Sequence, residues 1–160
     1  MSDKAKQAVA IFQQHVDSSD GHGEWLTVDQ ARINLFADAT LDHQFIHIDP
    51  EKSAKLSPYK VTIAHGFLTL SLIPHLTSSI AARDARAYDG LVMGVNYGLD
   101  KVRFPAPVPV NSKLRAERTL LEAELKAPNT VQLKQQVTIE IDGAPKPACV
   151  AEFLTRLIYA

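Results

Sequence analysis

The chain has 160 residues, of which 46% are hydrophobic, and its 17 basic and 18 acidic side chains leave a formal net charge of −1. This length and apolar content suit one compact domain. The balanced charge, without a block of either sign, argues against a broad electrostatic surface for nucleic acid or an anionic membrane.

Two further features bear on the compartment. No apolar run approaches the roughly 20 residues of a membrane span, and the polar, amphipathic start MSDKAKQAVAIFQQH lacks a signal-peptide core. The single cysteine, Cys149, has no intrachain partner for a disulfide, which favours a reducing environment. We therefore expect a cytoplasmic protein that does not associate with membranes.

The first third of the chain predicts helices. Residues 3–16 carry apolar side chains at roughly helical spacing, and the polar segment DSSDGHG (17–23) then predicts a loop. Thr27 followed by Gln30 has the pattern of a capping box, which predicts the start of a second, short helix. This helix should end near Thr40 and bury Ile33, Leu35, Phe36 and Ala39. Asp49 before Pro50 suits an N-cap with proline at the first helical position, so 50–55 predicts a third helix.

Residues 64–81 predict a buried central helix, because the middle of this segment is almost continuously apolar. Pro74 lies within it and predicts a bend or an early end. Beyond Gly90, alternation and β-branched residues predict four consecutive strands, connected by segments rich in turn-forming residues. The strands are LVMGVNYGLDKVRF, KLRAERTLLEAEL, TVQLKQQVTIEI and ACVAEFLTRLIY, so 91–158 reads as a β-meander.

A long apolar helix followed by antiparallel strands requires an α+β arrangement, in which the helix lies across the concave face of a curved sheet. That is the outline of a hot-dog fold, a long central helix wrapped by a curved antiparallel β-sheet. No internal repeat, low-complexity tract or long linker divides the chain. We therefore expect one domain over residues 1–160.

Ionisable side chains concentrate in residues 36–54, FADATLDHQFIHIDPEKSA, just outside the predicted helices. A carboxylate and an imidazole that converge on one water can orient it, remove a proton and deliver a proton elsewhere, and Asp42 and His47 are candidates for this pair. Capping and local hydrogen bonds would explain the same residues equally simply. Asp49 is better explained as a helix cap, and His43 as an exposed loop residue.

His65 and Gly66 stand at the predicted start of the central helix. The first turn of a helix has N–H groups without partners, and glycine lets a ligand approach the backbone, so an oxyanion could bind there. Alternatively, Gly66 only permits close packing of the helix against the sheet. The histidines outside this region, His15, His22 and His75, lack metal-ligand spacing with cysteines or acidic residues, so we expect no metal site.

Together, FADATLDHQFIHIDPEKSA and TIAHGFLTLSLIP resemble the signature of the MaoC-like dehydratase and (R)-specific enoyl-CoA hydratase family. That signature is a loop of the form G-D-x-N-P-x-H, followed some twenty residues later by H-G at the start of the hot-dog helix. The segment NYGLDKVRFPAPVPVNSKLRA resembles the nodulation-protein-N-like branch. By this resemblance, the catalytic residues are Asp42 and His47, and the glycine whose amide faces the thioester oxygen is Gly66. Leu41 replaces the family glycine before the aspartate, which predicts a different loop path.

The resemblance implies reversible syn hydration of a trans-2-enoyl thioester to an (R)-3-hydroxyacyl thioester, without a metal or any other cofactor. It also implies a homodimer, for which the exposed edges of an antiparallel sheet give a physical motive. Two alternatives remain. One is a hot-dog acyl-CoA thioesterase. Such enzymes commonly place a carboxylate on the central helix, and this alternative is disfavoured because residues 64–81 contain no Asp or Glu. The other is a non-catalytic acyl-thioester-binding protein.

Overall fold

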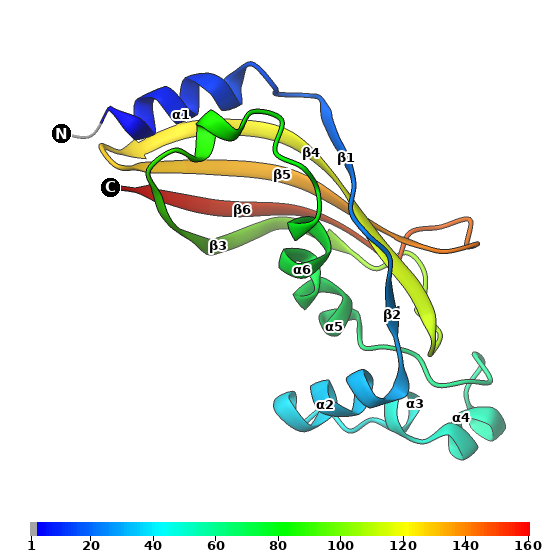
Figure 1. Ribbon diagram of the computed structural model, residues 1–160. Helices are drawn as coiled ribbons and strands as arrows, with labels where there is room; N and C mark the ends of the chain where they lie inside the picture. Colours follow the sequence, from blue (N-terminus) through cyan, green and yellow to red (C-terminus); the bar gives the residue numbers. More distant parts are fainter. Residues whose placement is uncertain (1–2) are drawn as a thin grey trace.

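Residues 3–160 are described by a computed structural model, in which a six-stranded antiparallel sheet carries helices on one face (Figure 1). The strands are β1 (Ser19–His22), β2 (Leu26–Val28), β3 (Leu91–Arg103), β4 (Ser112–Ala127), β5 (Thr130–Ile141) and β6 (Cys149–Tyr159). They lie in the order β1-β4-β5-β6-β3, and β2 also pairs with β4. The four predicted strands are therefore confirmed, and the fold is the expected α+β arrangement.

The strand order corrects the predicted β-meander. Strands β4, β5 and β6 do pair in sequence, but β3 pairs with β6 at the far edge and not with β4. The segment between β3 and β4, PAPVPVNS, contains three prolines, which cannot donate backbone hydrogen bonds to a tight hairpin. It crosses the end of the sheet instead, held by hydrogen bonds such as that from the N–H of Ala106 to the carbonyl of Pro147.

The predicted loop at 17–23 contains β1. Ser19 lies opposite Thr119 and His22 opposite Glu117, with an irregularity between them. Because the partner strand is far away in the sequence, local composition gives no sign of so short a strand. The two strands β1 and β2 bring the chain along β4 and then away from the sheet, toward the helices that follow (Figure 1).

Helix α1 (Lys4–Gln13) forms as predicted but ends three residues earlier. Helix α2 (Gln30–Thr40) is capped by Asp29, whose side chain accepts a hydrogen bond from the N–H of Arg32, so the predicted capping box at Thr27 is wrong. Its buried residues are Ile33 and Ala37, whereas Leu35 is 70% exposed. The prediction for Leu35 fails because α2 packs through a narrow apolar stripe.

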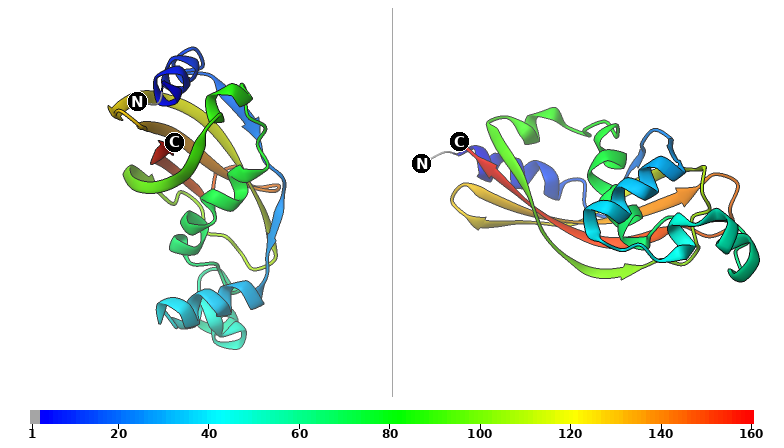
Figure 2. Two further views of the ribbon diagram at one scale, coloured as in Figure 1. Left: turned by 60° about the vertical axis from the view of Figure 1, so that its left-hand side comes forward. Right: turned by 90° about the horizontal axis from the view of Figure 1, so that it is seen from below.

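The short helices α3 (Phe45–Ile48) and α4 (Pro50–Leu56) follow. Asp49 caps α4 by accepting from the N–H of Lys52, as predicted. Figure 2 shows that α2, α3 and α4 lie together beyond one end of the sheet. The group is anchored to the rest of the fold by Ile33 of α2, which is buried in the same apolar core as Leu114 of β4.

The predicted central helix is two helices, α5 (Gly66–Ser71) and α6 (Ile73–Ser78), with Leu72 between them. Pro74 occupies the first turn of α6, where its missing N–H costs nothing, so the expected break is confirmed. A short 3₁₀ helix, η1 (Ala85–Tyr88), precedes β3. Two separate apolar cores cover the same face of the sheet: one lies under α5 and α6, and the other lies under α1.

Candidate active site

Asp42, His47 and His65 come together where the α2–α4 group meets the start of α5. One potential ligand atom from each lies within 4.8 Å of the others. Asp42 lies between α2 and α3, His47 lies within α3, and His65 is the N-cap of α5. His47 therefore sits in a short helix and not in the loop that we predicted. Asp42 is exposed, whereas His47 and His65 are 7% and 2% exposed.

The hydrogen bond of His47 defines which ring nitrogen faces the site. Its Nδ1 lies 2.7 Å from the carbonyl oxygen of Ile63. A carbonyl oxygen only accepts, so Nδ1 carries the hydrogen, and in the neutral ring Nε2 presents a lone pair. His47 is thus held in the tautomer that suits a general base acting through Nε2.

His65 is held in the opposite manner. Its Nε2 lies 3.0 Å from the backbone carbonyl of Asp42, so Nε2 carries the hydrogen. Its Nδ1 is buried and has no hydrogen-bond partner among residues 3–160. The two imidazole rings stack with centroids 3.8 Å apart and planes 24° apart, and Phe36 packs against the ring of His65. His65 therefore ties the Asp42 loop to α5 and forms one wall of the site.

Burial lowers the pKa of His47 below its ordinary value of 6.5. The hydrogen bond to Ile63 raises this pKa, nearby His65 lowers it and Asp42 raises it, but desolvation is the largest effect. At neutral pH the ring is therefore uncharged. That is the state required of a group that removes a proton from water.

Gln30 positions the backbone beneath His47. Its side-chain amide donates to the carbonyl of His47 at 2.7 Å and accepts from the hydroxyl of Thr62 at 2.6 Å. We expected Gln30 to belong to a capping box. Instead, it links α2, α3 and the segment before α5 around the candidate site.

Leu41, which replaces the family glycine, has a left-handed backbone with φ of 63° and ends α2. Its side chain is 80% exposed. The loop therefore follows a glycine-like path despite the leucine, at a cost in backbone strain of about 1–2 kcal/mol. The different loop path expected at Leu41 stays a prediction.

Gly66 is the first residue of α5, where a backbone N–H has no acceptor within the helix. A Cβ added here would lie 3.1 Å from the ring of Phe104, which is tighter than an ordinary contact. Both readings of this glycine thus retain support: the position leaves an N–H available, and it also permits close packing.

Two groups of side chains have donor sets suited to a cation. One is Asp42, His47 and His65; the other is His22, Glu117 and Glu140 on the opposite face of the sheet, where His22 lies 3.2 Å from Glu140 and 3.8 Å from Glu117. The strands bring His22 close to acidic residues that are distant in the sequence. The absence of a bound metal, expected from the sequence, stays a prediction.

The other two histidines of this region, His43 and His65, differ in how far the sequence predicts them. His43 is exposed, as expected, and it also pairs with Asp38, which was not predicted. His65 was missed as a site residue in its own right, because only the fold reveals its stacking on His47. The sequence signal was the H-G pair itself, which was interpreted through its glycine.

Known proteins resemble this chain in sequence. Residues 11–141 match the family described as MaoC like domain. The chain is 48% identical over 152 residues to 3-hydroxyacyl-thioester dehydratase Z of Mycobacterium tuberculosis, covering 95% of this chain and 97% of the relative. It is 45% identical over 135 residues to nodulation protein N of Rhizobium leguminosarum bv. viciae, covering 84% and 81%.

A solved structure with a similar fold is the unliganded R-hydratase PhaJ1 of Pseudomonas aeruginosa. The TM-score is 0.64 at 23% identity, covering 91% of this chain and 83% of that one. At this identity the likeness shows the fold alone, which confirms the hot-dog architecture.

Proposed function

Because this chain belongs to the family of MaoC-like domains, we propose that it is a hydro-lyase that reversibly adds water to a trans-2-enoyl thioester to form an (R)-3-hydroxyacyl thioester. The observation that carries the proposal is the tautomer of His47, whose Nδ1–H is held by the Ile63 carbonyl so that Nε2 keeps its lone pair, in a ring that lies beside Asp42. The curated relative with 48% identity is named as a dehydratase of 3-hydroxyacyl thioesters.

In the proposed step, Nε2 of His47 removes a proton from a water molecule while the Asp42 carboxylate accepts the other O–H of that water. The water oxygen bonds to the β-carbon, and the electrons of the C=C bond move onto the thioester carbonyl as an enolate. The enolate then collapses, and the proton returns to the α-carbon. Water is consumed, and no electrons are gained or lost overall.

The N–H of Gly66 would donate a hydrogen bond to the enolate oxygen. Such a donor, already in place before the reaction, is often worth about 3 kcal/mol in the transition state. His65 would take no proton in this scheme. It would keep the Asp42 loop in position through its hydrogen bond to the Asp42 carbonyl.

A homodimer is the proposed assembly. Strand β3 forms one edge of the sheet, and its apolar side chains are largely exposed: Val92, Met93, Val95, Tyr97 and Leu99 are between 41% and 60% exposed. An edge strand of this length with exposed apolar side chains is a template for pairing with another strand. A second copy is the simplest partner for it.

The cellular location of the protein and its independence of a cofactor are also proposals. Among the described residues, no helix is both long and apolar enough to cross a membrane. Burial raises the pKa of the Cys149 thiol to about 11, so this cysteine suits a reducing compartment and offers no reactive thiolate. We propose a cytoplasmic location and catalysis without a resident cofactor.

The test is hydration of crotonyl-CoA and of a medium-chain trans-2-enoyl-CoA, with chiral analysis of the product. Wild type should form the (R)-alcohol, Asp42→Asn and His47→Gln should lose activity, and His43→Gln, an exposed neighbour, should retain it. Release of free CoA thiol without loss of the double bond would establish the thioesterase alternative. Binding without turnover would establish a non-catalytic acyl-thioester-binding protein.

A further inference from the structure

The two apolar cores on the inner face of the sheet are separated by a row of polar side chains. Along β4, Arg118 lies between inward-facing Ala116 and Leu120, and along β5, Gln135 lies between Leu133 and Val137. Thr155 of β6 and Asn96 of β3, which lie opposite each other, extend the row toward the edge of the sheet. Arg118, Gln135 and Thr155 are half-buried and Asn96 is exposed, so the row remains open to solvent and to a ligand.

The row lines a cavity of about 210 Å³ between α6 and the sheet. Its polar lining residues are Thr77, Tyr88, Asn96, Arg118, Gln135 and Thr155. Among residues 3–160, the side chains of Asn96 and Gln135 and the hydroxyl of Tyr88 have no hydrogen-bond partner. Burial also raises the pKa of Tyr88, so this hydroxyl stays protonated and able to donate.

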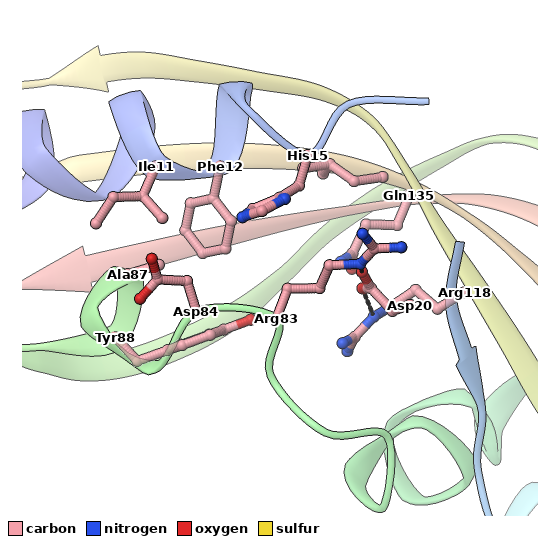
Figure 3. Close-up of a pocket in the computed structure, with 11 residues that line it drawn as sticks. Ile11, Phe12, His15, Asp20, Arg83, Asp84, Ala87, Tyr88, Arg118 and Gln135 are labelled. Carbon is pink, nitrogen blue, oxygen red and sulfur yellow. Dashed lines mark hydrogen bonds and ion pairs between the residues drawn. The ribbon is translucent and has the colours of Figure 1, made fainter. Parts of the chain in front are cut away.

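Arg118 is the charged member of the row, and its side chain is only 13% exposed. Its Nε donates to Asp20 at 2.8 Å, and Arg83 lies 3.4 Å from the other oxygen of the same carboxylate. Figure 3 shows Asp20 between the two arginines. The three side chains together carry one net positive charge. Within the described part of the chain, the terminal amino groups of Arg118 make no hydrogen bond, so they remain free for an anion.

The polar cavity adjoins a larger one that lies between α5, α6 and the edge strand β3. The larger cavity, of about 370 Å³, begins at Leu70, one helical turn beyond Gly66, and runs along α5 and α6 to Pro74. The two cavities share Pro74, Asn96 and Phe153. Pro74 stands eight positions after Gly66 along α5, Leu72 and α6, a path of about 12 Å at the rise of an α-helix. An extended chain advances roughly 1.2 Å per bond, so an acyl chain of about ten carbons would reach the polar row.

We propose that this enzyme accepts acyl thioesters whose far end carries a carboxylate, and that Arg118, assisted by Gln135 and Asn96, binds this carboxylate. The inference rests on the function proposed above and adds the substrate class. The acyl chain lies along the apolar first cavity, and its terminal carboxylate receives two hydrogen bonds from the free amino groups of Arg118. A charged group with bidentate hydrogen bonds suits a guanidinium better than any other side chain.

The test compares trans-2-decenedioyl-CoA with trans-2-decenoyl-CoA, which differ only at the far end. Wild type should show a kcat/KM roughly tenfold or more higher for the diacid, as expected for a hydrogen-bonded charge. Arg118→Met should abolish this preference while retaining activity on the monoacid. A wild-type preference for the monoacid, or an equal loss on both substrates in Arg118→Met, overturns the proposal.

Three further variants separate binding from folding. Arg115→Met removes an arginine from the same strand but from the opposite face, where it pairs with Glu140, and it should keep the preference. Gln135→Leu leaves the Asp20–Arg118 pair intact and should reduce the preference. If Arg118→Met does not fold because Asp20 loses its nearer partner, the double variant Asp20→Asn/Arg118→Met removes both charges and should fold without the preference.

A binding measurement keeps this inference distinct from the proposed function. Calorimetry with the saturated decanedioyl-CoA and decanoyl-CoA requires no turnover. Tighter binding of decanedioyl-CoA by wild type, lost in Arg118→Met and reduced in Gln135→Leu, supports the carboxylate site even if neither enoyl thioester is hydrated. Equal binding of the two saturated thioesters overturns it even if hydration is observed.

Discussion

His47 and His65 show how much of the site is decided at the scale of single residues. Each ring gives one nitrogen to a backbone carbonyl, Nδ1 to Ile63 in one case and Nε2 to Asp42 in the other. The sequence predicts that Asp42 and His47 cooperate. It does not predict the stacking of His65, because that contact depends on where α5 begins relative to α3.

The first prediction concerns the pH dependence of the rate. Because burial lowers the pKa of His47 from 6.5, the ring stays neutral, and able to act as a base, until the pH falls below that value. We expect kcat/KM to decline on the acid side with a midpoint below 6.5. The measurement is a pH profile of enoyl-CoA hydration, and a midpoint above 6.5 would show that His47 is not the base.

Stability should respond to the same group. The unfolded chain, whose histidine has the ordinary pKa, binds a proton before the folded chain does, so protonation favours unfolding. Stability from His47 is therefore complete above pH 6.5 and is lost as the pH falls through the lowered folded pKa. Urea unfolding from pH 7.5 to 5 should show a steeper decline for wild type than for His47→Gln. Equal slopes in the two proteins would contradict this reasoning.

Leu41 offers a third prediction. Its φ of 63° is strained for leucine and relaxed for glycine, and its 80% exposed side chain loses little packing on removal. Leu41→Gly should therefore raise the free energy of unfolding by about 0.5–1 kcal/mol, after allowing for the greater flexibility of glycine in the unfolded chain. Urea unfolding measures this change, with Leu41→Ala as a control that shortens the side chain but keeps the strain. A destabilised Leu41→Gly would mean that the leucine side chain has a packing role.

At the scale of elements, local sequence patterns predict most of the helices and strands that form, but few of the pairings between strands. The four long strands and the Asp49 cap of α4 are predicted because alternation and the Asp-Pro pair are local signals. The pairing of β3 with β6, the presence of β1 and the exposure of Leu35 depend on partners distant in the sequence. The candidate site lies at such a junction, between α3 and the start of α5, so its candidate residues follow from the sequence whereas its geometry does not.

The start of α5 carries the fourth prediction. A methyl group at position 66 would press on the ring of Phe104, which is 40% exposed and can move outward. Gly66→Ala should therefore change the free energy of unfolding by less than about 1 kcal/mol while lowering kcat/KM at least tenfold, since the N–H proposed to bind the enolate oxygen is displaced. The added variant Phe104→Leu should recover part of the activity. Wild-type kcat/KM in Gly66→Ala would leave Gly66 with a packing role only.

At the scale of the whole molecule, the sheet holds two cores that are separated by a polar row. The core under α1 and the core under α5 and α6 leave the space between them to Arg118 and Gln135. The first cavity opens beside β3, the edge strand whose apolar side chains are exposed. The proposed assembly and the proposed substrate binding therefore concern the same edge, because a strand added to β3 would cover the opening.

The fifth prediction tests this connection. Val95 on β3 and Val61 before α5 are 43% and 42% exposed, so lysine replaces a similarly exposed valine at each position. A lysine on an edge strand opposes pairing with another strand, because its charge would have to be buried. Light scattering should give wild type and Val61→Lys twice the 17.6 kDa mass of one chain, and Val95→Lys the mass of a single chain.

The same variant tests the acyl cavity. In Val95→Lys, kcat/KM should fall more for medium-chain thioesters than for crotonyl-CoA, because only the longer chain extends along the uncovered cavity. A dimeric Val95→Lys would place the interface elsewhere, and a monomeric variant with equal losses on both thioesters would separate assembly from the acyl cavity.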